Sequence, residues 1–215
     1  MKMGLKILLG FGIAVIAMQA NALSITASSC PADAGSGGTY YTDSDGTDWM
    51  CWTAEGLYQE PIGNSGKTRD IVNPDAADVF AITGVEVELY YKNDVDTGET
   101  ATTGGFERHY DTEFTPTTDP MQAIISHIGG SSIACPECFV LVKDGNTSPT
   151  WYLFDIGYWN GTDPLELLNF WPGNGSISHV SIFGAPGQIP EPAPLALLAI
   201  ALVGLGVHSL RKKVR

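Results

Sequence analysis

The sequence has an apolar segment at each end and an acidic chain between them. Residues 7–18 are apolar apart from glycine, and residues 195–207 form a second apolar run without charge. Residues 23–189 contain five basic and 23 acidic side chains, a net charge of −18. That length suffices for one domain with its own core. Because such a surface repels phosphate backbones, we do not expect nucleic acid to be a partner.

The N-terminal segment has the features of an export signal. Lys2 and Lys6 precede the apolar run, and Gln-Ala-Asn-Ala at residues 19–22 follows it. Signal peptidase reads small residues at the positions of Ala20 and Ala22, so we expect residues 1–22 to be removed after Ala22. The alternative is an uncleaved N-terminal anchor, for which the apolar run is short.

Four cysteines fit an exported chain. Cys30 and Cys51 bracket an early loop, and Cys135 and Cys138 form a Cys-Pro-Glu-Cys sequence. Exported chains oxidise their thiols, which favours structural disulfides. Four cysteines allow three pairings that sequence cannot separate, and we expect the local pairs Cys30–Cys51 and Cys135–Cys138. A redox pair and a zinc site remain alternatives, although thioredoxin context and zinc-knuckle spacing are both missing.

The C-terminal tail combines three elements. Residues 185–194 are a linker that contains the sequence Pro190-Glu191-Pro192. Residues 195–210 follow as an apolar helix near the lower length limit for crossing a bilayer. The basic end consists of Arg211, Lys212, Lys213 and Arg215. By the positive-inside rule this end stays in the cytoplasm while the acidic middle is exported.

The order of these tail elements resembles the PEP-CTERM sorting signal of proteins exported by Gram-negative bacteria. The resemblance covers about the last 26 residues and rests on Pro190, Glu191 and Pro192, the apolar helix and the basic end. It implies a transient inner-membrane anchor, recognition and removal of the tail by an exosortase, and delivery to the cell surface or the exopolysaccharide matrix. The alternative is a plain C-terminal membrane anchor.

Residues 23–184 have the pattern of a β-rich ectodomain. Apolar and charged residues alternate over residues 85–90, and residues 139–142 and 151–154 are apolar runs joined by Asp-Gly turn chemistry. Residues 177–183 alternate loosely and are expected to close the sheet. We therefore predict a mainly β fold, an antiparallel sandwich with jelly-roll-like character.

Three segments leave their secondary structure open. Residues 71–82 mix proline, aspartate and apolar residues and allow no assignment. Asp119-Pro120 is suited to start a helix that ends at Gly129, yet residues 123–128 fit a strand equally well. Residues 163–168 raise the same ambiguity.

An acidic loop offers oxygen ligands for a hard cation. Asp43, Asp45 and Asp48 surround Gly46, and calcium binds such carboxylates. The spacing is not that of an EF-hand, and an ordinary acidic turn is the alternative. A second loop at residues 94–99 shows the same pattern more weakly. No cofactor is expected.

Trp159 and Trp171 lie beside Gly and Asn turns and are the candidates for exposed rings that stack on sugar faces. Packing in the core or at a sheet edge is nevertheless the interpretation we favour, since tryptophan in a sandwich is more often buried, and sugar contact is the alternative.

No catalytic motif accompanies the histidines of the chain. The four are His109, His127, His179 and His208. We therefore expect a non-enzymatic surface or matrix protein whose partners are signal peptidase, exosortase, the membrane and extracellular polysaccharide. A carbohydrate-binding module is the second hypothesis and a secreted hydrolase is the third.

Overall fold

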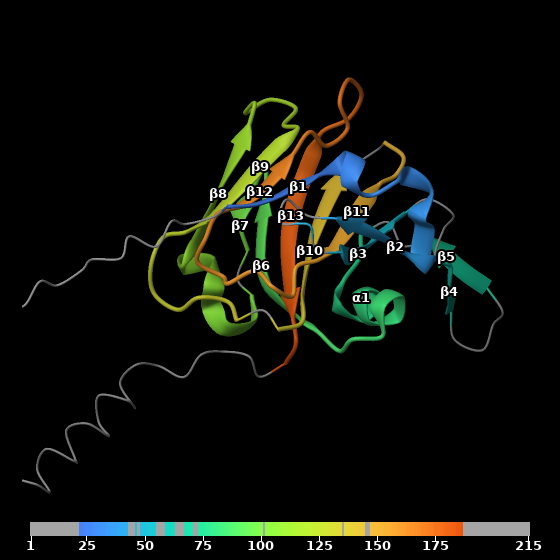
Figure 1. Cartoon of the computed structure of the whole chain (residues 1–215), viewed down its shortest axis with the longest axis horizontal. Helices are drawn as coiled ribbons and strands as arrows, with labels where there is room; N and C mark the ends of the chain where they lie inside the picture. Colours follow the sequence, from blue (N-terminus) through green and yellow to red (C-terminus); the bar gives the residue numbers. More distant parts are fainter. Residues whose placement is uncertain are drawn as a thin grey trace, which may run out of the picture.

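The computed structural model describes residues 22–42, 46, 48–54, 59–62, 67–70, 73–100, 102–134, 136–144 and 147–186. This part of the chain is mainly β, as the sequence predicts, with two sheets and a separate two-stranded hairpin. Figure 1 shows β1 (Leu23–Thr26), β8 (Tyr110–Thr115), β9 (Gln122–His127) and β12 (Leu165–Leu168) in the upper part of the view, and α1 (Ala76–Thr83) below β3 (Asp48–Thr53) of the larger sheet.

The large sheet is antiparallel throughout, in the order β2-β3-β11-β10-β13-β6-β7. Its centre is occupied by β10, which is buried along its whole length and is apolar from Cys138 to Val142 before it ends in Lys143 and Asp144. The strands are β2 (Thr39–Thr42), β3 (Asp48–Thr53), β6 (Glu88–Asp94), β7 (Gly98–Glu99), β10 (Cys138–Asp144), β11 (Trp151–Asp155) and β13 (Ile177–Gly184).

The small sheet has the order β1-β12-β9-β8. Its strands are β1 (Leu23–Thr26), β8 (Tyr110–Thr115), β9 (Gln122–His127) and β12 (Leu165–Leu168). β12 pairs in parallel with β1, so the prediction of a purely antiparallel fold is wrong at this pair. A parallel pair needs a long connection, and here nearly the whole domain lies between the two strands.

The remaining elements are short. They are the hairpin β4 (Gln59–Ile62) and β5 (Lys67–Asp70), the helix α1 (Ala76–Thr83), and the 3₁₀ segments η1 (Ala27–Ser29), η2 (Ala32–Gly37) and η4 (Thr103–Arg108). Asp75 starts α1 with a capping box, in which its side chain accepts from the amides of Ala77 and Asp78. Gly84 ends α1 with φ +76°, a left-handed conformation that glycine adopts without strain.

The two sheets enclose one apolar core between their facing surfaces. Ile125 and Leu167 of the small sheet belong to the same buried cluster as Val142, Phe154 and Ile182 of the large sheet. A hydrogen bond of 2.8 Å between the hydroxyls of Tyr91 and Thr112 joins β6 to β8 across this core. Tyr110 completes it by donating to the Gly161 carbonyl and accepting from the Ile133 amide. The interior is therefore apolar, and these buried hydroxyls have partners.

The opposite surface of the large sheet carries a second cluster. Phe139, Leu141, Leu153 and Phe183 project from it, and Val79 of α1 belongs to the same cluster. The large sheet is thus covered by the small sheet on its inner face and, in part, by α1 on its outer face.

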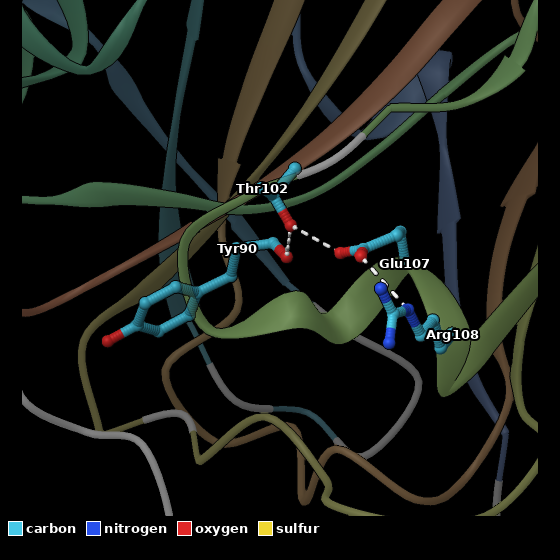
Figure 2. Close-up of polar contacts among 4 residues, drawn as sticks. All are labelled: Tyr90, Thr102, Glu107 and Arg108. Carbon is cyan, nitrogen blue, oxygen red and sulfur yellow. Dashed lines mark hydrogen bonds and ion pairs between the residues drawn. The ribbon is translucent and has the colours of Figure 1, made fainter.

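A β-bulge in β6 turns consecutive tyrosines toward the core. The pairing with β13 shifts between Ile182 and Phe183, and both Tyr90 and Tyr91 are fully buried. Figure 2 shows the hydroxyl of Thr102 donating to the carbonyl oxygen of Tyr90 at 2.5 Å. Glu107 lies 3.5 Å from the same hydroxyl and 3.6 Å from Arg108 Nε. These contacts attach the start of η4 to the bulged strand.

The structure decides the segments that the sequence left open. Residues 119–129 contain the strand β9, residues 163–168 contain β12, and residues 71–82 contain most of α1. The predicted hairpin is confirmed as β10–β11. Residues 177–183 form β13, which pairs with β10 and β6 inside the sheet rather than closing its edge.

Candidate functional site

Cys30 and Cys51 form a disulfide, with their Cα atoms 5.9 Å apart. Both residues are buried in the core between the sheets. Cys138 is also disulfide-bonded, and no cysteine among the described residues is free. The prediction of the pair Cys30–Cys51 is confirmed. Cys135 lies outside the described residues, so the pair Cys135–Cys138 stays a prediction.

Trp159 and Trp171 are buried, with 3% and 5% of their surfaces exposed. The indole N–H of Trp159 donates to the Asp163 carbonyl, and that of Trp171 donates to the Pro149 carbonyl, each at 2.8 Å. The favoured interpretation of packed rings is therefore confirmed, and the alternative of exposed rings that stack on sugars is wrong for these two residues. Turn residues beside a tryptophan mark a change of chain direction, and here that change carries each ring into the core.

The predicted calcium loop is only partly described. Asp48 is exposed and accepts a hydrogen bond of 2.7 Å from the Thr42 hydroxyl, while Asp43 and Asp45 lie outside the described residues. In the second loop, the Asp94 side chain accepts from the Asp96 amide and Glu99 accepts from Asn93. Within the described ranges, no three His, Cys, Asp or Glu side chains gather as a metal site.

The residues of the sorting motif lie outside the described part of the chain, as does Ala20. They are Pro190, Glu191, Pro192, Arg211, Lys212, Lys213 and Arg215. Ala22 is the first described residue, and the Leu23 amide that follows it donates to the Pro164 carbonyl. A search of the described residues found no helix with the length and apolarity needed to cross a membrane; the predicted helix 195–210 was not among them.

A cavity lies on the outer face of the large sheet, beside the N-terminal end of α1. Its volume is about 700 Å³. We call it the outer-sheet cavity. It is lined by β6, β13 and the chain that leads into α1, including Asn73, Lys92, Asp94, His179, Ser181 and Phe183.

Strand register explains why polar groups meet at this cavity. Ser181 lies opposite Lys92, and His179 lies opposite Asp94 on β6. His179 also lies opposite Lys143 on β10. Alternate residues of a strand share a face, so these side chains extend the row that begins with Phe183 under α1. The cavity is the part of the outer face where this row becomes polar.

His179 is uncharged at neutral pH. Burial lowers its pKa to about 4, and the positive charges of Lys92 and Lys143 act in the same direction, against the weaker influence of Asp94. A neutral imidazole both donates and accepts a hydrogen bond.

Lys143 lies opposite His179 on β10 and does not itself line the cavity. Only 4% of its surface is exposed, and its ammonium donates to the Asp144 carbonyl at 2.5 Å. Burial lowers the pKa of Lys143, with a further contribution from Lys92 and an opposing one from Asp144. This side chain is therefore held in place by the protein and supplies positive potential to the cavity.

Three side chains of the cavity have no partner among the described residues. Neither Lys92, His179 nor Ser181 makes a side-chain hydrogen bond or ion pair there. Ser181 is only 2% exposed, and buried hydroxyls in proteins nearly always have a partner. All three residues line the cavity, so a bound ligand can supply hydrogen-bond partners to them.

Sequence reasoning missed this site. Its members come from positions 73–77, 89–94 and 179–183 and from no recognisable motif. The one signal in the sequence was that basic residues are rare. Lys92 and Lys143 are two of only five between positions 23 and 189.

Comparisons of the chain with protein-family models, with curated proteins and with solved structures found no match.

Proposed function

We propose that this chain is an exported, non-enzymatic protein of the bacterial surface or exopolysaccharide matrix, sorted by its C-terminal tail. The observation that carries the proposal is the order of the tail: Pro190-Glu191-Pro192, an apolar segment at residues 195–210, and a basic end. In this proposal signal peptidase removes residues 1–22. The tail then holds the protein briefly in the inner membrane until an exosortase removes it.

The disulfide supports export. A bond between Cys30 and Cys51 forms and persists in oxidising compartments, whereas cytosolic thiols are kept reduced. Its position in the core means that the fold and the oxidised state depend on each other.

The chain is fixed to the domain as far as Ala185, where the linker that carries the motif begins. β13 ends at Gly184, and the next residue, Ala185, is fixed by the Tyr90 hydroxyl and by the Glu137 carbonyl. An enzyme at the membrane needs an open peptide, and in this proposal the proline-containing linker at residues 185–194 provides it.

We also propose that the domain is a β-sandwich. Two sheets that share one core between their facing surfaces support it. A jelly-roll-like arrangement is the form we expect, with the parallel pair β1–β12 as an addition at the edge of the small sheet. We assign this domain an interaction role and no catalytic activity.

Mass spectrometry of the mature protein tests the sorting proposal. The surface and matrix fractions should contain chains that begin at Leu23 and lack the residues beyond the Pro-Glu-Pro motif. A variant with Pro190, Glu191 and Pro192 all changed to Ala should keep its tail and stay in the inner membrane.

The matched control is Glu137→Ala, which removes an exposed glutamate from the folded domain and should leave processing unchanged. Surface protein with an intact C-terminus would contradict the sorting proposal. Stable inner-membrane retention of the unchanged chain would instead identify the tail as a plain anchor.

A further inference from the structure

The outer-sheet cavity concentrates positive charge in an acidic domain. Residues 23–189 have a net charge of −18 and only five basic residues, yet Lys92 and Lys143 lie on the two strands that flank His179. Among the cations with described side chains, Arg108 is paired with Glu107 and Lys143 donates to a carbonyl. Lys92 has neither kind of partner among the described residues and lines the cavity. It can therefore receive one anionic group.

The other groups of the cavity are suited to hydroxyls. The Asp94 carboxylate accepts hydrogen bonds, the hydroxyl of Ser181 donates and accepts, and the neutral imidazole of His179 does both. The first free amides of α1 are not available for an anion, because the Asp75 side chain accepts from Ala77 and Asp78. Recognition of a negative charge thus falls to Lys92.

One wall of the cavity is apolar. Phe183 and Leu89 line it beside the polar row, and Pro74 borders it near the start of α1. The apolar C–H face of a pyranose ring packs against such surfaces, while its hydroxyls need the polar groups. The volume of about 700 Å³ lies within the range of small-ligand sites, roughly 300–1,000 Å³.

From this combination we propose that the outer-sheet cavity binds a hexuronic acid, with the sugar carboxylate on Lys92 and its hydroxyls on Asp94, His179 and Ser181. One free cation matches one carboxylate. A densely charged polyanion is disfavoured, because the surrounding domain repels it. The inference concerns the folded domain and stands whether or not the tail is processed, so the test below does not depend on sorting.

The test is a titration of the full-length chain in mild detergent with glucuronic acid, followed by calorimetry and by backbone amide NMR. Glucose, which has the ring without the carboxylate, and acetate, which has the carboxylate without the ring, are the comparison ligands. Since a hydrogen bond to a charged group contributes roughly a factor of ten or more, we expect glucuronic acid to bind at least about tenfold tighter than either. The amide signals that shift should be those of Lys92, His179 and Ser181.

Lys92→Gln should weaken glucuronic acid binding by about tenfold and leave the weak binding of glucose unchanged. The matched control is Arg108→Gln, which removes one positive charge from a side chain that is 85% exposed and should not alter binding. Equal binding of glucose and glucuronic acid, an unchanged affinity in Lys92→Gln, or shifts confined to residues outside the cavity would each overturn the proposal. The NMR mapping uses the unaltered chain, so it decides the location even if the variant folds poorly.

Discussion

The two faces of the large sheet are built from the same strands and differ in what they carry. On β13, Val180 and Ile182 point into the core between the sheets, whereas His179 and Ser181 line the outer-sheet cavity. The inner face shares a buried apolar cluster with the small sheet, and the outer face is covered in part by α1. Side chains that face another sheet are apolar and closely packed. Side chains on a face that is left open can be polar. The comparison teaches that a site can alternate, residue by residue, with the core that supports it.

The largest loss of unfolding free energy should come from truncating a core side chain on the inner face. Phe154 is fully buried and makes edge contacts with Tyr41 and Phe170, at ring separations of 5.4 and 6.0 Å. Phe154→Ala leaves a cavity and should lower the free energy of unfolding by about 3–5 kcal/mol, measured by urea denaturation. Phe80→Ala, at a helix position that is 52% exposed, should change it by less than about 0.5 kcal/mol. Similar losses in both variants would remove the distinction between packed and open surfaces.

Removing the Cys30–Cys51 disulfide at the inner face should cause the next largest loss of stability. It closes a loop with a sequence separation of 21, for which the chain-entropy model gives about 3 kcal/mol. The double variant Cys30→Ser/Cys51→Ser should lose that amount of unfolding free energy under oxidising conditions. Its binding of ligands in the outer-sheet cavity should persist wherever it remains folded. A loss below about 1 kcal/mol would show that packing alone holds this part of the inner face.

The outer face should respond to acid. The folded-state pKa of His179, about 4, lies below the unfolded value of 6.5, so the unfolded chain binds the extra proton first. Stability from this group is therefore complete above pH 6.5 and is lost as the pH falls toward 4, by at most about 3 kcal/mol. The charged groups facing it are Lys92 and Asp94 on β6 and Lys143 on β10.

The measurement for His179 is the free energy of unfolding at several pH values, in the unaltered chain and in His179→Gln. The difference between the two should grow between pH 6.5 and 4 in favour of the variant. A constant difference across that range would mean that the imidazole is not buried against positive charge.

The smallest change in unfolding free energy should come from Ser181 on the outer face, compared with its neighbour Val180 on the inner face of the same strand. Ser181→Ala removes a hydroxyl that has no partner among the described residues, and should change the unfolding free energy by less than about 0.5 kcal/mol. Val180→Thr places a hydroxyl in the inner core and should cost about 1–3 kcal/mol, since buried polar groups without partners are costly. Thermal or urea unfolding of both variants checks the contrast, and equal effects would contradict it.

Local patterns predicted the local parts of the fold. The β10–β11 hairpin follows from two apolar runs around a turn, because both strands and their connection lie in one short stretch. β9 and β12 were ambiguous, since a short apolar run fits a helix or a strand until a neighbour takes its hydrogen bonds. The tryptophans show the same limit: residue type beside a turn does not tell which way Trp159 and Trp171 face.

The sequence by itself determined the acidic charge and the mainly β character, whereas the pairing of Cys30 with Cys51 was only an expectation until the structure showed it. The sequence also supplied the tail on which the proposal of export rests. Only the tertiary structure decided the parallel pairing of β1 with β12 and the meeting of Lys92, Lys143 and His179. The physical reason is that strand pairing joins residues far apart in the chain, and their register depends on the whole sheet.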